Sequence, residues 1–462
     1  MYVYRAPLIV AWGLIILIVT GMAVWQAMPE KSAKNGLEDP TGLVMVQLQG
    51  EYLLGVASLL GSEREIASQA LMLDAGTIDQ RQRYMAFMIA LGDFELAKQS
   101  ALRMHVELEE QGLELSGQQS KVQEDLDLLT EGVALPNGNE LLEKQLGWFG
   151  LLLEADEAQR AELEESAGRK VLAVGGIVLF IGFAAIIGFV GLVILLVRLL
   201  GGSLKSGLFE EKQRHAIYAE VFAVWLLLFL SFMTLAAMSG MAFADENAAL
   251  AMGLSLFAFF ASLVALFWAR IRGISWNQIR KDIGWTGGKG VLKEILWGIA
   301  GYAMMLPILG IGVILVLLLI AIQSFFSSAV GSDSFSGTSG TAHPIVLDIA
   351  NGGWQVRILL VTLAAVAAPI VEETMFRGVL YRQLRTSSNK LGIALSIISS
   401  VLLTSFLFAV IHPQGWIAIP ALMAIPIGMN LMREWRGTIL PSMIVHGMSN
   451  GLVTSMMIIF LS

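Results

Sequence analysis

Few side chains that can do acid–base chemistry lie in the apolar segments near the C-terminus, and ionisable groups inside a membrane are functional candidates because burying them is costly. They form three groups: Glu372, Glu373 and Arg377, then His412, then His446 with Asn450. A carboxylate and two imidazoles can transfer protons near neutral pH, and an amide can donate hydrogen bonds to a developing oxyanion. The set therefore contains what water-mediated hydrolysis of a peptide bond requires.

Helical geometry separates the two adjacent glutamates. Glu373 and Arg377 are four residues apart, so on a helix they share one face and can form an ion pair. Glu372 is turned by about 100° from Glu373 and faces a different environment. Pro369 comes just before this acidic pair and predicts a local break or kink in the helix.

The histidines show a similar spacing. His446 and Asn450 are one helical turn apart, so both can point into one cavity, and Phe408 lies one turn before His412 and can form its wall. A single membrane histidine often only joins two helices, and a Glu–Arg pair is often structural. The ordered set E-E-x-x-x-R, F-x-x-x-H and H-x-x-x-N is therefore far more specific than any one of its parts.

The composition predicts a membrane protein. Hydrophobic residues make up 56% of the 462 positions and charged residues 15%, against about 25% charged residues in a typical soluble protein. The absence of cysteine excludes disulfides, thiolate metal ligands and cysteine nucleophiles. Residues 29–169 hold 26 acidic and 11 basic residues. No part of the chain has the clustered basic footprint of a nucleic-acid-binding protein.

Nine apolar segments approach the roughly 20 residues that a membrane helix needs. They are predicted at 7–28, 172–197, 218–240, 250–269, 295–322, 357–376, 391–411, 417–432 and 438–461. The predicted fold class is therefore all-α, a polytopic integral membrane protein with an inserted soluble, acidic helical domain at 29–169. We interpret 1–28 as an uncleaved signal anchor, because its apolar run is longer than the roughly 7–15 residues of a signal peptide. Residues 170–249 are predicted to form transmembrane helices of unknown role.

Basic residues predict the orientation. With a cytoplasmic N-terminus, the basic residues outside 29–169 fall at cytoplasmic ends except for Lys170 and Arg357, as the positive-inside rule requires. Residues 29–169 are then extracytoplasmic, and the plasma (inner) membrane is the favoured localisation. The loop 323–356, rich in Gly and Ser around 326–341, is predicted to be a flexible external connector.

The segments EETMFR, FAVIH and HGMSN resemble, in this order, the three motifs of the CPBP (ABI) family of intramembrane metalloproteases, which includes the type II CAAX prenyl endopeptidases. The resemblance is close over 357–455 and implies an intramembrane peptidase core at 250–462. The short segment DIGW at 282–285 is compatible with such a core.

The resemblance implies a role for each matching residue. Glu372 would be the general base that acts on water together with His412. His446 and Asn450 would stabilise the tetrahedral oxyanion. The supporting residues would be Glu373, Arg377 and Phe408.

The metal and the substrate stay open at this point. A zinc ion would be held by Glu372, His412 and His446 with one open position, but a metal-free mechanism has also been argued for the family, and we favour no obligatory metal. The expected substrate is a membrane-associated protein or peptide, and the family suggests a prenylated CAAX tail. The expected surroundings are the lipid bilayer, and 29–169 could recruit a protein partner.

Weaker candidates and other hypotheses remain. A G-x-S-G pattern at 337–340 mimics the rhomboid serine-protease motif but lies in the Gly/Ser-rich loop, and we interpret His343 nearby as a loop residue. His105 and His215 lie in polar surroundings. The absence of H-E-x-x-H argues against a site-2-protease type of zinc enzyme. Two non-enzyme hypotheses are a membrane scaffold or bacteriocin-immunity-type protein with the same fold, and a transporter with a Glu/His/Arg proton relay.

Overall fold

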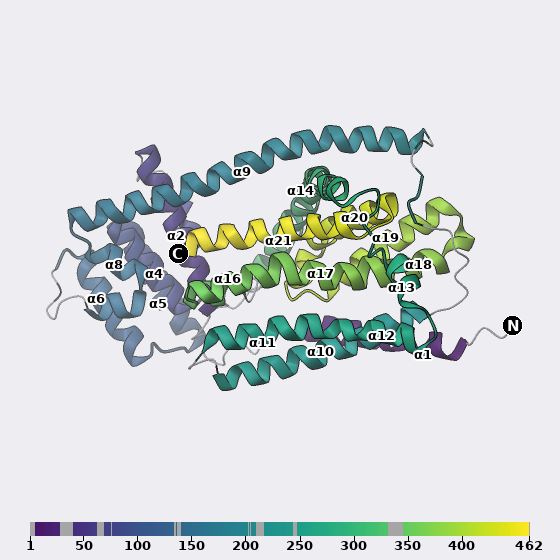
Figure 1. Cartoon of the computed structure of the whole chain (residues 1–462). Coiled ribbons are helices and arrows are strands. Elements are labelled where there is room, and N and C mark those ends of the chain that lie inside the picture. The colour runs from purple at the N-terminus through teal and green to yellow at the C-terminus, as the bar shows by residue number, and fades with distance from the viewer. Residues whose placement is uncertain are drawn as a thin grey trace. The chain divides into compact units, whose positions relative to one another are not determined.

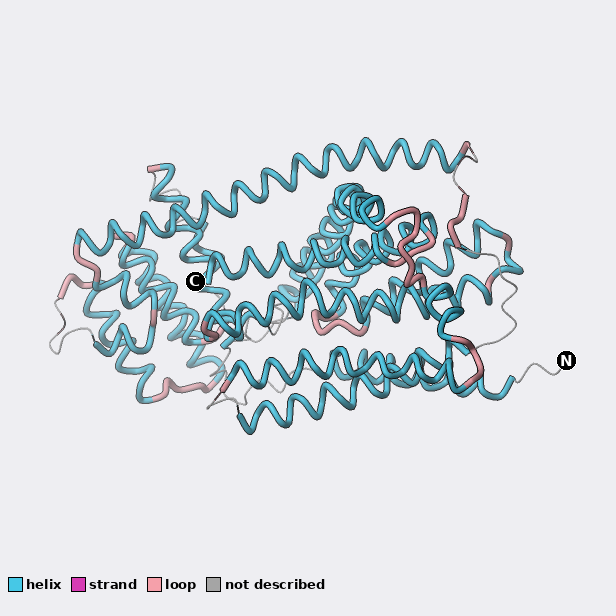
Figure 2. The backbone as a smooth tube through the Cα atoms, in the orientation of Figure 1, coloured by secondary structure: helices cyan, strands magenta, loops and turns pink. Residues whose placement is uncertain are grey.

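In the structure, a computed structural model, the described residues form helices joined by turns and loops, with no strand among them (Figures 1 and 2). Ten described segments are long and apolar enough to cross a membrane, and they include all nine predicted spans, which confirms the predicted all-α polytopic membrane fold. The G-x-S-G pattern, His215 and His343 lie outside the described residues. The described residues are 5–27, 40–61, 69–74, 76–133, 135, 140–201, 203, 205–208, 217–243, 247–330 and 345–461.

The connector predicted at 323–356 is partly helical. Helix α14 (Val291–Val330) continues into its first part, and α15 (Ile345–Asn351) occupies part of its end. Residues 331–344 lie outside the described part of the chain. The Gly/Ser-rich composition that predicted a loop therefore begins several residues before the helix ends.

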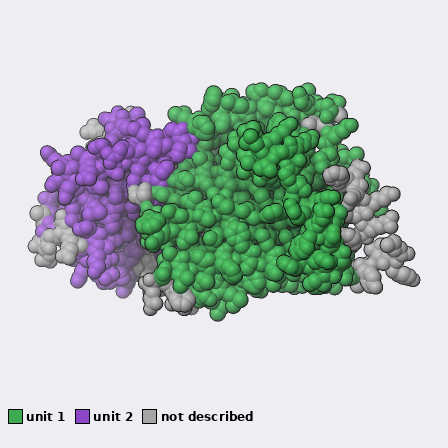
Figure 3. Space-filling view, in the orientation of Figure 1, with its two compact units in different colours: residues 1–28, 179–324, 351–458 green, residues 29–178, 325–350, 459–462 purple. Residues whose placement is uncertain are grey.

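The chain forms two compact units, coloured separately in Figure 3. Unit 1 comprises Met1–Met28, Leu179–Ser324 and Asn351–Ile458, and unit 2 comprises Pro29–Val178, Phe325–Ala350 and Ile459–Ser462. The long helix α9 (Glu157–Leu200) contributes its first part to unit 2 and its last part to unit 1.

Unit 2 is a set of helices around a hydrophobic core that includes the aromatic residues Tyr84, Phe87 and Phe149. Capping boxes at Thr77 and Ser116 start two of these helices, because each hydroxyl accepts a hydrogen bond from the N–H three residues on. Phe87 and Phe149 are fully buried and pack edge to face, with ring centroids 6.0 Å apart. Its helices besides α9 and α15 are α2 (Pro40–Leu60), η1 (Leu71–Leu73), α4 (Ile78–Ala90), α5 (Phe94–Gln111), α6 (Gly117–Thr130), α7 (Glu140–Leu146) and α8 (Trp148–Glu154).

Helix α2 is the one of the ten candidate spans that was not among the nine predicted. It lies in the segment for which a soluble domain was predicted, and its Leu54 is buried in the core of unit 2. Glu51 forms an ion pair with Lys170 of α9 at 2.8 Å. The two helices touch closely at Gly55, where an added Cβ would lie 2.5 Å from the Ala167 carbonyl oxygen.

Unit 1 carries the predicted site residues. Helix α1 (Arg5–Ala27) turns one row of side chains four residues apart into its core, from Ala11 and Ile15 to Val19 and Ala23, and it packs beside α10 (Figure 1). The other helices of unit 1 besides α9 and α14 are α10 (Ile217–Phe243), α11 (Ala248–Ala261), η2 (Ser262–Ala265), α12 (Leu266–Ile271), α13 (Trp276–Ile283), α16 (Trp354–Thr362), η3 (Leu363–Ala367), α17 (Ala368–Glu373), η4 (Thr374–Leu380), α18 (Tyr381–Ser387), η5 (Asn389–Leu391), α19 (Ile393–Val410), η6 (Trp416–Ala418), α20 (Ile419–Arg436) and α21 (Leu440–Leu461).

The close approach at Gly55 predicts a stability effect. Gly55→Val is expected to destabilise the contact between α2 and α9 by about 1–3 kcal/mol, because the new side chain meets backbone that cannot move aside easily. Thermal unfolding of the full-length protein in detergent, with protease sensitivity of unit 2, measures the effect. Gly117→Val is the matched control, since a Cβ at that helical glycine meets no atom within 4 Å. Equal stability of the two variants would contradict the packing described for α2.

Candidate active site

Two π-helical segments, η3 and η4, flank α17, the short helix that ends in the two glutamates. In η3 the N–H of Ala368 donates to the carbonyl of Leu363, five residues back. The next bond in this register would need an N–H at Pro369, which proline lacks, so the carbonyl of Ala364 has no donor from its own helix. The side-chain amide of Asn450 supplies that donor, with Nδ2 3.0 Å from the Ala364 oxygen. The irregularity predicted at Pro369 is thus a π-helical segment completed by α21.

Glu373 connects its own motif, which contains Arg377, with the motif that contains His446. Its Oε1 accepts hydrogen bonds from Nη1 of Arg377 at 2.7 Å and from Nδ1 of His446 at 2.9 Å. The expected pairing with Arg377 is present, and both of its side chains are fully buried. Because an ionised carboxylate can only accept, we assign a hydrogen to Nδ1 of His446 from this contact.

Glu372 faces both histidines. Its Oε2 lies 3.9 Å from Nε2 of His446 and 4.0 Å from Nε2 of His412, beyond direct hydrogen-bond distance. No described residue hydrogen-bonds to this buried oxygen. Nδ1 of His412 lies 2.6 Å from the Phe408 carbonyl oxygen, which accepts its hydrogen. The lone pair of His412 is therefore on Nε2, on the side of Glu372.

The ring of Phe408 packs against both histidine rings and the guanidinium of Arg377. Its centroid lies 4.3 Å from that of His412 and 5.8 Å from that of His446. The guanidinium carbon of Arg377 lies 4.7 Å from the same ring, a cation–π distance. Phe376 packs edge to face against it at 5.1 Å. The ring thus lies beside both imidazoles, as the sequence predicted, and also covers the arginine.

The structure brings most of the predicted site residues together. Glu372, His412 and His446 converge, and Phe408 and the Glu373–Arg377 pair surround them. Asn450 contacts the backbone of η3, one turn farther along α21 than His446, a contact that the sequence analysis did not anticipate. The catalytic roles given to these residues stay predictions.

Arg433 is a residue that the sequence analysis did not assign to the site. It was counted among the basic residues at cytoplasmic ends, yet it is only 1% exposed. Its guanidinium donates to the carbonyls of Arg377 at 3.3 Å, Asp282 at 2.8 Å and Gly437. Gly284 gives it room, since this residue has φ +82° and an added Cβ would lie 2.5 Å from Nη1 of the arginine. Arg433 therefore links the DIGW segment to η4.

The indole of Trp285, the last residue of the DIGW segment, adds a further contact to the site helix. Its Nε1 donates to the hydroxyl of Thr374 at 2.8 Å, and that hydroxyl donates to the carbonyl of Ile370 at 2.7 Å. The hydroxyl of Thr438 donates to the carbonyl of Gly284 at 3.0 Å. The junction of α17 with η4, the DIGW segment and the turn before α21 are thus joined by polar contacts.

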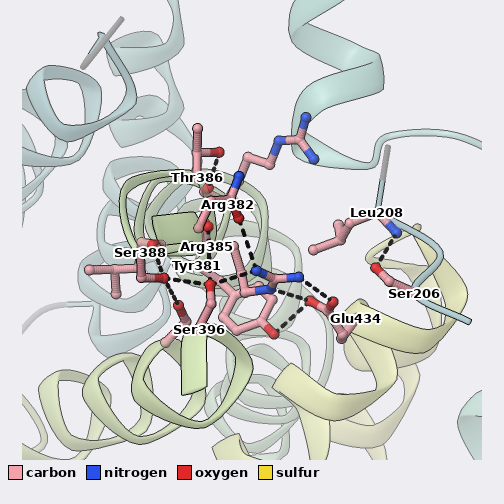
Figure 4. Close-up of polar contacts among 12 residues, drawn as sticks. Ser206, Leu208, Tyr381, Arg382, Arg385, Thr386, Ser388, Ser396 and Glu434 are labelled. Carbon is pink, nitrogen blue, oxygen red and sulfur yellow. Dashed lines mark hydrogen bonds and ion pairs between the residues drawn. The ribbon is translucent and has the colours of Figure 1, made fainter. Parts of the chain in front are cut away.

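A second polar cluster joins α18, α19 and α20 (Figure 4). Arg385 binds Glu434 in a bidentate manner at 2.9 and 3.0 Å, and the hydroxyl of Tyr381 donates to the same carboxylate at 2.8 Å. A third nitrogen of Arg385 donates to Ser396 at 2.6 Å, and Ser388 lies 2.6 Å from that hydroxyl. The residues that the sequence analysis counted as flanking charges and the structure largely buries are Arg382, Arg385, Arg433 and Arg436.

The three residues that would hold zinc in the alternative left open by the resemblance converge, but their spacing is wider than that around a bound ion. Two ligands of one tetrahedral zinc lie roughly 3.3 Å apart for bonds of about 2.0 Å, whereas Glu372 Oε2 is 4.0 and 3.9 Å from the two imidazole nitrogens. Among the described residues no group of three His, Asp or Glu side chains is placed to hold a metal ion.

Residues 354–452 match the family model of type II CAAX prenyl endopeptidase Rce1-like proteins. This match confirms the resemblance predicted from the three motifs and indicates a CAAX-protease-type fold for the Rce1-like segment, as we call 354–452. The segment begins with the first residue of α16, ends within α21 and contains all seven predicted site residues. No curated protein and no solved structure matches the chain.

The contact between Asn450 and η3 predicts an energetic coupling. Asn450→Ala is expected to lower the free energy of unfolding by about 1–3 kcal/mol, because it leaves the Ala364 carbonyl without a donor. In a Pro369→Ala background the restored backbone N–H can serve that carbonyl, so the same substitution should cost less. Thermal unfolding of the four proteins in detergent measures the coupling. Strictly additive effects would contradict the role given to Pro369.

Proposed function

We propose that this protein is an intramembrane endopeptidase that hydrolyses a peptide bond of a membrane-associated substrate. One observation carries the proposal: Glu372 Oε2, buried and without a hydrogen-bond partner among the described residues, faces Nε2 of His412 and of His446 at about 4 Å. Polar atoms at this separation are suited to sharing a water molecule between them. The match of the Rce1-like segment to a peptidase family supports the same conclusion.

In the proposed reaction the Glu372 carboxylate takes a proton from water while the water oxygen attacks the peptide carbonyl carbon. His412 accepts a hydrogen bond from the other water hydrogen at Nε2, because its own hydrogen is donated from Nδ1 to Phe408. This contact orients the attacking lone pair toward the carbonyl, which lowers the entropic part of the barrier.

The negative charge then develops on the former carbonyl oxygen. His446 can donate to it from Nε2 only as an imidazolium, because its Nδ1 hydrogen is donated to Glu373. The carboxylate of Glu373 balances that positive charge. Asn450 would contribute its second Nδ2 hydrogen, since the first is donated to Ala364. When the C–N bond breaks, Glu372 returns its proton to the leaving amine. One water is consumed, and a carboxylic acid, which keeps the second water hydrogen, and an amine are formed.

Other polar atoms around the site also have no partner among the described residues. They are Oε2 of Glu373 and the Nε and Nη2 atoms of Arg377. A buried polar atom without a hydrogen bond costs roughly 1–3 kcal/mol, and charged groups cost more. Both side chains are fully buried and the ring of Phe408 covers the guanidinium, so we assign these atoms to the support of the site and not to substrate binding.

The substrate and the orientation are part of the same proposal. We propose a membrane-associated protein or peptide, with a prenylated CAAX tail as the first candidate because of the Rce1-like match. The proposed location is the plasma membrane, with a cytoplasmic N-terminus, an uncleaved anchor at 1–28 and an extracytoplasmic domain at 29–169 that recruits substrate or a partner. Exposed basic residues at predicted cytoplasmic ends, such as Arg280 and Lys390, support the orientation.

The catalytic proposal is tested with two substitutions. Glu372→Gln and His412→Ala are each expected to lower the cleavage rate at least about 100-fold, because general-base catalysis contributes roughly 10²–10⁴-fold. The measurement is cleavage by the purified protein in detergent of a farnesylated CAAX peptide and of a pool of unmodified membrane peptides, read by mass spectrometry. His105→Ala is the matched control, since its Nδ1 also contacts a carbonyl one turn back, at 2.8 Å, but in unit 2.

The outcomes separate the hypotheses. Cleavage that survives both substitutions would show that other residues are catalytic. Wild type and variants that bind peptides equally well and cleave none of them would favour the scaffold or immunity-type hypothesis.

The proposed mechanism needs no obligatory metal. Treatment with a chelator, followed by its removal, is expected to leave the cleavage rate unchanged. Elemental analysis of the purified wild type and of His446→Ala should give the same zinc content, well below one ion per chain. Stoichiometric zinc that is lost together with activity in His446→Ala would contradict this mechanism and support the three-ligand alternative.

A further inference from the structure

A cavity of about 360 Å³ lies in unit 1 between α9, α14 and the end of α20. This volume is within the roughly 300–1,000 Å³ range of small-molecule sites. None of its lining residues belongs to the candidate active site. The lining is apolar along most of its length, and Arg198, Trp297 and Trp435 lie together toward one end of the helices.

Two glycines of α9 shape this cavity. At Gly188 the helices α9 and α14 are in backbone contact, since an added Cβ would lie 1.8 Å from the Ala303 carbonyl oxygen. At Gly191 an added Cβ would meet only the flexible side chain of Met304, at 3.1 Å. A side chain at Gly188 is therefore excluded by backbone, whereas one at Gly191 would project into the cavity.

The exposed side chains next to the cavity indicate whether it opens to lipid or to water. Ile187, Ile194 and Val197 on α9 and Leu296 on α14 are all large, apolar and more than half exposed. Both helices are candidate membrane spans. In a bilayer these side chains face acyl chains, so the molecules that reach the cavity first are lipids.

At the end of the cavity lined by Arg198, Trp297 and Trp435, Arg198 supplies a positive charge. Arg198 is exposed in the last turn of α9, and no acidic side chain of the described residues pairs with it. Arg436 lies 5.5 Å from the ring of Trp297 and 5.1 Å from that of Trp435, but Glu294 neutralises it through two hydrogen bonds of 2.9 and 2.7 Å. Tryptophan is enriched at the membrane–water interface, and an unpaired arginine there attracts anionic headgroups.

The length of the cavity fits one leaflet. An ideal helix rises about 16 Å between Ile187 and Arg198, the ends of the lined part of α9. Half of a hydrocarbon core about 30 Å thick is about 15 Å. We propose that this cavity binds one anionic phospholipid, with its phosphate at Arg198 and one acyl chain beside Gly191 and Met304. This inference does not depend on the proposed peptidase activity.

The test compares lipid retention by variants of the full-length protein. The protein is reconstituted with equal amounts of phosphatidylglycerol and phosphatidylcholine, extracted, and its bound lipid is measured by native mass spectrometry. Wild type is expected to retain one phosphatidylglycerol in preference to phosphatidylcholine, and Gly191→Leu is expected to lose it. Gly182→Leu is the matched control on the same helix, because its Cβ meets no atom within 4 Å, and it should behave like wild type. Ala300→Leu fills the cavity from α14, so the test does not depend on one variant.

The charge is tested separately. Arg198→Gln is expected to reduce the preference for phosphatidylglycerol about fivefold, the effect of one basic residue near an anionic surface, whereas Arg198→Lys should retain it. Equal binding of the two lipids by wild type would overturn the proposal of an anionic lipid. Equal lipid retention by Gly182→Leu, Gly191→Leu and Ala300→Leu would overturn the site itself.

Discussion

One carboxylate oxygen, Oε1 of Glu373, accepts hydrogen bonds from Arg377 and from His446, and the geometry of the candidate site depends on it. Within a membrane a buried charge persists only when an opposite charge or several hydrogen bonds compensate it. The pair with Arg377 lies within one helical segment, whereas the contact with His446 reaches α21. That contact also turns the imidazole, so its other nitrogen faces Glu372. The two adjacent glutamates therefore lie on either side of one histidine ring.

The same constraint applies to the backbone, and it extends the functional unit beyond the Rce1-like segment. Irregular backbone at membrane depth is tolerated where protein groups satisfy it. Asn450 serves the carbonyl that Pro369 leaves without a donor, and Arg433 donates to carbonyls of η4, of α13 and of the turn before α21. Asp282 lies outside 354–452. The helices that precede the match therefore hold the candidate site in position together with it.

The sequence predicted the features that depend on residues close together along the chain. Hydropathy located nine spans, and the i, i+4 spacing predicted the pairing of Glu373 with Arg377. Contacts through space were not predictable: the spacing that placed Asn450 beside His446 does not reveal a carbonyl on another helix. Arg433 was counted as a flanking charge because the sequence gives its position along a span and not its neighbours. Helix α2 was not predicted as a span. It meets the length and composition of one, while its buried residues pack in the core of unit 2.

A comparison within the protein bears on the choice between a scaffold and an enzyme. Glu294 is a structural carboxylate: one oxygen accepts from Arg436 at 2.9 Å, and the other accepts from Arg436 at 2.7 Å and from the Lys289 N–H at 2.9 Å. The Glu372 side chain is 12% exposed, whereas that of Glu294 is fully buried. The Oε2 atom of Glu372 has no hydrogen-bond partner among the described residues, and two imidazole nitrogens face it. A carboxylate that only locks helices together gains stability from being satisfied. The contrast between the two carboxylates therefore supports the proposed role of Glu372 in acting on water.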